Sequence, residues 1–168
     1  MARDILAYVA RDLTGPEGGF HTAEDADSAV EVGSLEHAEG AFYVWTAEEL
    51  RDALGADAPW FAEHFGIEAQ GNVPGQLDPQ GELRGRNILV QRRSLTETAR
   101  RLGVTPEEAN LRLMGALERL RARRARRPRP LLDDKVVTAH NGLMISALAR
   151  AHQVLGSTPE EDYLGRAA

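Results

Sequence analysis

The chain has 168 residues, of which 42% are hydrophobic and 27% are charged, and its formal net charge at pH 7 is −6. A chain of about this length buries roughly two thirds of its unfolded surface, so we expect one ordinary domain with its own hydrophobic core. The composition excludes a disordered tail and a membrane protein, the acidic balance gives no reason to expect a nucleic-acid partner, and the absence of cysteine excludes disulfides and thiolate metal sites.

The N-terminal segment, residues 1–14, is predicted to form an amphipathic helix. Its apolar residues are interrupted by two Arg-Asp pairs, at positions 3–4 and 11–12. The segment therefore has neither the apolar centre of a signal peptide nor the length of a membrane span. We expect a cytoplasmic protein that does not contact a membrane.

Two stretches without a helical period are predicted to be long loops. The first holds residues 18–28, GGFHTAEDADS, and residues 39–45, EGAFYVW, whose aromatic and β-branched run predicts a short strand. The second is residues 71–90, GNVPGQLDPQGELRGRNILV, which is rich in turn residues and ends in another strand pattern. Long loops on a helical scaffold usually carry function.

Capping signals predict the helices. Thr46 and Ser94 each stand three residues before a glutamate, which is the spacing of a capping box. Thr105 and Thr158 are each followed by proline at the first helical position. Glycine follows four of the helical patterns, where a left-handed residue ends a helix, at positions 55, 66, 103 and 156. The predicted helices cover residues 46–54, 57–65, 94–102, 106–127 and 135–155, and a further start is expected at Thr158.

The two long helices differ in their apolar patterns. Residues 106–127 have a one-sided stripe, at Ala109, Leu113, Leu117 and Leu120, whereas residues 135–155 are apolar in nearly every direction. The second helix should therefore be a core helix, buried on most sides. Inner and outer helices in alternation favour a layered ring of helical hairpins over a simple four-helix bundle.

The helices predicted here amount to roughly half of such a ring, which cannot cover the helix at 135–155 on all sides. We therefore expect an incomplete domain with an exposed apolar patch, and self-association through it. The residues expected in this patch are Leu143, Ile145, Leu148 and Val154.

Five strings carry a resemblance to a known family. They are, in order, GGFHTAEDADS, EGAFYVWTAEEL, GNVPG, RGRNILV and RPRPLLDDKVVTAHNGLMISALA. The chain closely resembles the middle region of the spermatogenesis-associated, thioredoxin-domain-containing protein family, which includes the bacterial YyaL type. The resemblance implies a mainly α fold, in which residues 1–168 are a fragment of an (α/α)6 toroid of the six-hairpin glycosidase type, with short β-strands in the long loops. The thioredoxin-like N-terminal domain of that family is absent from this sequence.

Lys135 is the only lysine, among 20 basic residues, and it follows Asp133 and Asp134 directly. An ammonium group is a compact charge whose pKa responds to burial, unlike a guanidinium. We expect these residues to form an ion cluster at the N-terminal end of the helix at 135–155, with at least one carboxylate bonded to free backbone donors. The cluster is either structural or catalytic, and a lysine retained by chance is the alternative.

Six-hairpin enzymes act on sugars with paired carboxylates, so the resemblance implies candidate site residues. The candidate catalytic residues are Asp25, Asp27, Glu39, Asp133, Asp134 and Lys135. The candidate substrate contacts are Phe20, Tyr43, Trp45, His140 and Asn141. Local hydrogen bonding is the alternative role for Asp25 and Asp27, and core packing is the alternative for Tyr43, Trp45 and His140.

Other chemistries fit less well. A calcium loop beginning at Asp25 would place Ala29 and Val30 where a ligand and a glycine are needed, and the histidines lack paired metal spacing. The arginines between 119 and 129 are typical of a helix end rather than of a nucleic-acid site. We expect no metal or cofactor. Two hypotheses remain: a domain that binds or acts on carbohydrate, and a non-catalytic helical scaffold that accompanies a thioredoxin-like domain.

Overall fold

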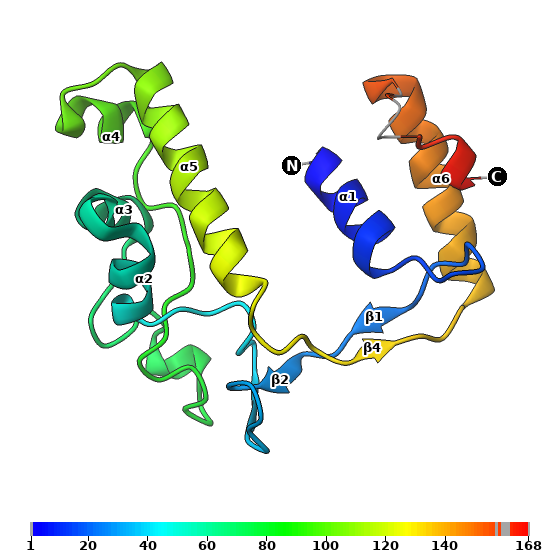
Figure 1. The fold of residues 1–168 in the computed structure, drawn as a ribbon, viewed down its shortest axis with the longest axis horizontal. Helices are drawn as coiled ribbons and strands as arrows, with labels where there is room; N and C mark the ends of the chain where they lie inside the picture. Colours follow the sequence, from blue (N-terminus) through cyan, green and yellow to red (C-terminus); the bar gives the residue numbers. More distant parts are fainter. Residues whose placement is uncertain (1, 157, 159–161, 168) are drawn as a thin grey trace. The chain divides into compact units, whose positions relative to one another are not determined.

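The computed structural model describes residues 2–156, 158 and 162–167, and this part of the chain is mainly α-helical (Figure 1). The chain divides into two compact units. The first unit combines Met1–Asp25 with Leu131–Ala168, and the second is Ala26–Pro130. The single core expected from the length is therefore divided into two clusters of buried side chains, one in each unit.

The second unit contains the helices α2 (Ala47–Leu54), α3 (Ala58–Phe65), α4 (Leu95–Leu102) and α5 (Pro106–Arg124). It also contains a hairpin of β2 (Asp27–Ala29) and β3 (His37–Glu39), and short 3-10 turns at Gly55–Asp57 and Gly75–Leu77. Helix α5 contacts α2 and α4 (Figure 1). The buried core of this unit consists of Trp45, Leu50, Leu54, Ala58, Phe61, Ala116 and Leu120.

The capping signals placed these helices within a few residues. Thr46 and Thr105 each complete a capping box, and the side chain of Ser94 accepts a hydrogen bond from the N–H of Glu97. Gly66 and Gly103 end their helices in the left-handed conformation that glycine favours. The helix start predicted at Thr158 would run through residues 159–161, which lie outside the described residues.

The first unit contains α1 (Ala2–Asp12), β1 (Ala23–Glu24), β4 (Leu132–Asp133), α6 (Thr138–Leu155) and a 3-10 turn at Gly165–Ala167. Strands β1 and β4 pair in antiparallel fashion, so segments that are far apart in the sequence lie side by side (Figure 1). The buried residues of this unit are Phe20, Leu148, Ala151 and Tyr163. No described helix is both long enough and apolar enough to cross a membrane.

Helix α6 is not the fully buried helix that its sequence predicted. Leu148 and Ala151 are buried, but Leu143 is 72% exposed, Val154 is 73% exposed, and Ile145 is also exposed. The described residues of the first unit cover one face of α6, and they leave Leu143, Ile145 and Val154 exposed. An exposed apolar surface was expected along this helix, and it is present at three of the four predicted positions.

The strand predicted at residues 39–45 is also wrong. Strand β3 ends at Glu39 because Gly40, with φ 68°, starts a turn in which its carbonyl accepts hydrogen bonds from the N–H groups of Tyr43 and Val44. Extended pairing returns only at Trp45, which forms a single bridge with Asn87. Residues 88–90, which also matched a strand pattern, form no strand.

Candidate functional site

Asp27 and Glu39 stand directly opposite each other on the hairpin of β2 and β3. The adjacent pair is hydrogen bonded, because the N–H of Gly40 donates to the carbonyl of Ala26 at 2.9 Å. Hydrogen-bonded and non-hydrogen-bonded pairs alternate in an antiparallel ladder, so Asp27 and Glu39 form a non-hydrogen-bonded pair, the closer kind. Their Cβ atoms should be about 4.5–5.5 Å apart on one face. The hairpin therefore places two of the predicted carboxylates next to each other.

A cavity of about 490 Å³ lies beside this pair in the second unit. Glu39 and Tyr43, both singled out from the sequence, line it. Asp78, Glu82 and Leu83 from the long loop at 71–90 form another part of its wall. This loop was expected to carry function, but its two acids were not named as candidates. The signal that could have identified them is their position in a turn-rich segment, LDPQGEL.

The base of the loop at 71–90 is held in place by Asn72. Its side chain donates to the carbonyls of Gly66 and Ile88, at 3.0 and 2.9 Å, and accepts from the N–H of Ile88 at 2.8 Å. Gly71 has φ 87°, and a Cβ atom there would lie 2.5 Å from the carbonyl oxygen of Arg86. Glycine is therefore required where the two ends of the loop meet.

Backbone donors position the two acids of the loop. Glu82 Oε2 accepts from the N–H of Glu39 at 3.2 Å, and Asp78 Oδ2 accepts from the N–H of Leu83 at 3.0 Å. Among the described residues, neither these acids nor Glu39 form an ion pair with a basic side chain. The cavity thus has a wall rich in hydrogen-bond acceptors beside the half-exposed ring of Tyr43. Such a wall suits a ligand that has several hydroxyl groups and an apolar ring face.

No group of three or more histidine, aspartate or glutamate side chains is placed to hold a metal ion in the part of the chain that the structure describes. The acids of this cavity offer hydrogen-bond acceptors and negative charge to a ligand.

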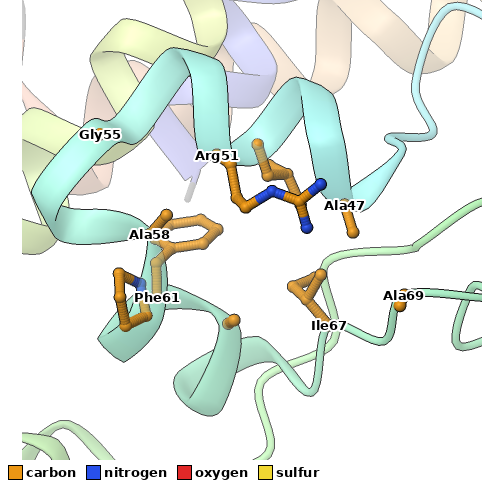
Figure 2. Close-up of a pocket in the computed structure, with 10 residues that line it drawn as sticks. Ala47, Arg51, Gly55, Ala58, Phe61, Ile67 and Ala69 are labelled. Atoms are coloured by element: carbon orange, nitrogen blue, oxygen red, sulfur yellow. The ribbon is translucent and has the colours of Figure 1, made fainter.

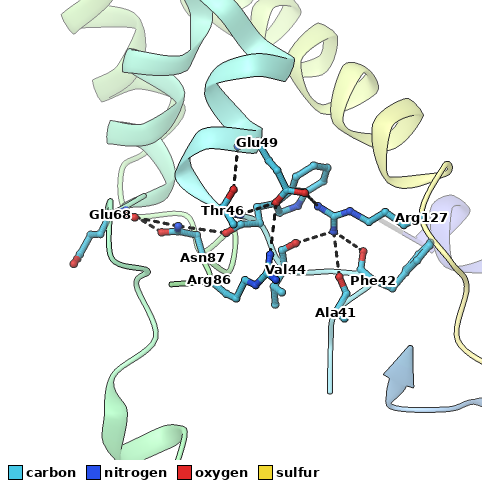
Figure 3. Close-up of polar contacts among 10 residues, drawn as sticks. Ala41, Phe42, Val44, Thr46, Glu49, Glu68, Arg86, Asn87 and Arg127 are labelled. Carbon is cyan, nitrogen blue, oxygen red and sulfur yellow. Dashed lines mark hydrogen bonds and ion pairs between the residues drawn. The ribbon is translucent and has the colours of Figure 1, made fainter. Parts of the chain in front are cut away.

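A second polar cluster, which we call the Arg127 cluster, links Arg127 to Glu49 and to the segment before α2 (Figure 3). Arg127 Nη1 donates to the carbonyls of Val44 and Phe42 at 2.7 and 2.9 Å, and Nη2 donates to Glu49 Oε1 at 3.0 Å. Burial lowers the pKa of Arg127, although the adjacent Glu49 carboxylate opposes this shift. Because its donors are used by the backbone and by Glu49, Arg127 has a structural role.

Asn87 lies within the loop at 71–90 and connects this loop to Trp45 and Glu68 (Figure 3). Its side chain is fully buried, accepts from the N–H of Glu68 at 2.8 Å, and donates to the carbonyls of Glu68 and Trp45 at 3.1 and 3.4 Å. The strings EGAFYVWTAEEL and RGRNILV meet here. Residues that make these two strings distinctive, such as Trp45 and Asn87, therefore stabilise the fold.

The structure corrects two of the predicted aromatic contacts with substrate. Trp45 is 2% exposed and Phe20 is 7% exposed, and each belongs to the core of its unit. An indole or phenyl ring stabilises a protein more when it is buried in the core than when it lies at a solvent-exposed surface. The sequence pattern alone could not distinguish core packing from substrate contact. Tyr43 remains the aromatic residue that lines the cavity.

The predicted ion cluster lies in the first unit, and its geometry is not that of a helix cap. Helix α6 begins at Thr138, and its N-cap, Val137, makes no side-chain cap. Asp133 belongs instead to strand β4, where it pairs with β1. Lys135 Nζ lies 3.2 Å from Asp133 Oδ2, but the lysine side chain is 73% exposed, so this pair adds little stability.

The segments 18–25 and 131–141 lie side by side in the first unit, and backbone groups take part in most of their hydrogen bonds. The side chain of Asn141 accepts from the N–H of Phe20 at 2.8 Å and donates to its carbonyl at 2.9 Å. Thr22 Oγ1 donates to the carbonyl of Lys135 at 2.7 Å. Asn141 thus has a structural role. The neighbouring His140 is exposed, as are Asp25 and Asp134, whereas residues 39–45 belong to the other unit.

No protein-family model matches the chain. The chain is similar to spermatogenesis-associated protein 20 of Homo sapiens, with 43% identity over 166 residues, 93% of this chain and 21% of that protein. It is 42% identical over 166 residues to the Mus musculus protein of the same name. An uncharacterised protein of Caenorhabditis elegans is 37% identical over 171 residues, which cover 98% of this chain and 23% of that protein. The chain spans about a fifth of the length of the relatives it matches.

Proposed function

Because the chain belongs to the spermatogenesis-associated protein 20 family, we propose that it is part of a six-hairpin (α/α)6 toroid domain with a carbohydrate site beside Glu39. One observation carries the proposal. Glu39, a predicted catalytic residue, and Tyr43, a predicted substrate contact, line one cavity of about 490 Å³ together with Asp78 and Glu82.

The chemistry of this cavity supports a sugar ligand. Sugar hydroxyl groups donate hydrogen bonds to ionised carboxylates, and such charge-assisted bonds are about twice as strong as neutral ones. The guanidinium of Arg124 lies 5.5 Å from the centroid of the Tyr43 ring, and the opposite face of this ring is the proposed contact for the C–H groups of a pyranose. Leu83 provides a further apolar contact within the same wall.

The reaction class that this arrangement supports is hydrolysis of a glycosidic bond. Glu39, which lines the cavity, is the proposed nucleophile, and Asp27 on the opposite strand is the proposed general acid. Retaining enzymes hold their two carboxyl groups about 5–5.5 Å apart, and inverting enzymes hold them about 6.5–9.5 Å apart to admit a water molecule. The Cβ atoms of directly opposite residues are about 5 Å apart, which allows Asp27 and Glu39 the shorter carboxyl separation, so a retaining reaction is the proposed class.

Isothermal titration with a panel of mono- and disaccharides tests the proposal. Glu39→Gln and Tyr43→Ala should each weaken the binding of a recognised sugar by about tenfold or more, because each removes a direct contact. Glu107→Gln, at an exposed position on α5 that does not line the cavity, is the control and should leave binding unchanged. Equal affinity in all four proteins, or no binding of any sugar, contradicts the proposal.

A specific observation favours the second candidate function, a non-catalytic helical scaffold that accompanies a thioredoxin-like domain in longer members of the family. Glu49, one of three acids on α2, is bound by Arg127 and lies 3.9 Å from Arg86, and a carboxylate paired in this way stabilises the fold and is not available to a substrate. Under this alternative the sugar panel gives no binding, although the Arg127 cluster still determines stability.

The proposal also covers partners and location. A small carbohydrate is the proposed ligand, and a second copy of the chain is the proposed protein partner, through the exposed α6 side chains Leu143, Ile145 and Val154. The proposed location is the cytoplasm.

A further inference from the structure

A second cavity, of about 320 Å³, opens between α2, α3 and residues 67–69 (Figure 2). Its lining includes Leu50, Ala58 and Phe61, which are 3%, 7% and 1% exposed and belong to the core of the second unit. Because tightly packed core side chains form its floor, the cavity is preformed, as most small-molecule sites are. It shares no lining residue with the cavity beside Glu39.

The walls of this cavity are apolar and made largely of small side chains. Ala47, Ile67 and Ala69 line it (Figure 2), and so does Ala62. Alanine at these positions leaves the room that larger side chains would fill. No carboxylate, amide or hydroxyl side chain is among the lining residues. A sugar would therefore lose its hydrogen bonds to water here without replacement, whereas a hydrocarbon chain or ring would gain from leaving water.

One charge stands at this apolar surface. Arg51 is the only ionisable residue among those that line the cavity, and no described residue forms an ion pair with its guanidinium. Figure 2 shows the guanidinium reaching over the open space between Phe61 and Ile67. A guanidinium offers a planar fork of N–H donors that matches a carboxylate, and the adjacent apolar walls strengthen such a pair by excluding water.

We propose that this cavity binds a small amphipathic monocarboxylate, whose hydrocarbon part lies on Leu50, Phe61 and Ile67 and whose carboxylate pairs with Arg51. The volume is near the lower end of the range of about 300–1,000 Å³ for ligand sites, which restricts the ligand to a short acyl chain or a single ring. The cavity excludes amines, because Arg51 would repel them, and it favours carboxylates over alcohols of the same length. This site is independent of the proposed sugar site.

Titration of the 168-residue chain with sodium octanoate, followed by the backbone amide signals in NMR spectra, tests the site. We expect saturable shifts at Ala62, Ile67 and Ala69, and much weaker binding of 1-octanol and octylammonium. Arg51→Gln should weaken octanoate binding about tenfold, equivalent to about 1.4 kcal/mol. Arg100→Gln, which alters another exposed helical arginine of the same unit, should bind octanoate as the wild type does.

Ala62→Leu should fill the cavity and abolish binding, and Ala69→Leu, at an exposed position, serves the same purpose if the first variant does not fold. Several results would overturn the proposal: no saturable shift with octanoate, equal binding of 1-octanol or octylammonium, or unchanged affinity in Arg51→Gln. Shifts that persist unchanged in both Ala62→Leu and Ala69→Leu would also overturn the proposal, since octanoate would then bind elsewhere.

Discussion

The guanidinium of Arg127 lies 4.1 Å from the centroid of the Trp45 ring. The same group donates hydrogen bonds to the carbonyls of Phe42 and Val44 and to the carboxylate of Glu49. The segment that follows α5 is thereby fixed to the segment that precedes α2, where Tyr43 lines the cavity. The position of the candidate sugar site therefore depends on an arginine that does not line it.

Arg127→Lys should lower the free energy of unfolding by about 2–3 kcal/mol, because an ammonium cannot replace the fork of N–H donors and leaves buried carbonyls without partners. Urea denaturation measures this change. Arg126→Lys, at an exposed neighbouring position, is the control and should stay within about 0.5 kcal/mol of the wild type. An equal loss in both variants would show that the Arg127 cluster has no special structural role.

Gly71→Ala should destabilise the second unit by about 1–3 kcal/mol, because alanine is strained at positive φ. Its Cβ would also lie 2.5 Å from the carbonyl oxygen of Arg86. Gly75→Ala is the matched control in the same loop, since Gly75 lacks both a positive φ and a nearby atom. Thermal unfolding monitored by circular dichroism compares the two. A melting temperature as low for Gly75→Ala as for Gly71→Ala would contradict this reading of the loop.

Burial lowers the pKa of His64 below its ordinary value, and the charge of Arg93 adds to this effect. The unfolded chain therefore binds a proton more readily, so the free energy of unfolding should fall as the pH decreases below about 6.5 and should be insensitive to His64 above about pH 7.5. His64 Nδ1 lies 2.7 Å from Thr98 Oγ1, and the imidazole ring is buried.

Urea midpoints at about pH 7.5 and pH 5 measure this dependence, and His64→Gln should reduce it. Asn110→Gln alters an exposed side chain that has no titratable group and should leave the dependence as it is in the wild type. The assignment fails if His64→Gln and the wild type lose the same stability on acidification.

Leu143→Ser and Val154→Ser, combined, should reduce self-association, because both side chains are more than two thirds exposed on α6 and would lose apolar area at a contact. Analytical ultracentrifugation over a range of concentrations measures the effect. Leu111→Ser removes a similarly exposed leucine, 71% exposed, from α5 and should not alter association. A wild-type chain that is monomeric at every concentration would exclude the proposed self-contact.

The limits of the helices could be predicted because capping is local. Thr46 and Thr105 determine where α2 and α5 begin through bonds that span three residues. The burial of α6 could not be predicted in this way, because it depends on which elements cover it. The end of strand β3 was missed for a similar reason, since the turn at Gly40 outweighs the β propensity of the residues that follow.

The candidate site was predictable only in part. The acids and aromatics were visible as residue types, and Glu39 and Tyr43 do line one cavity. The pairing of Glu39 with Asp27 depends on hairpin register, and the presence of Asp78 and Glu82 depends on how the loop at 71–90 folds back. Neither can be derived from local patterns.

NMR mapping of a bound sugar is the decisive measurement for the cavity beside Glu39. In a titration of the labelled chain with the tightest sugar of the panel, we expect saturable amide shifts at Gly40, Tyr43 and Leu83, which line this cavity. The signals of Ala62 and Ile67, in the other cavity, should not move. Shifts centred away from the Glu39 cavity, or no shift with any sugar, would contradict the claim that this cavity binds carbohydrate.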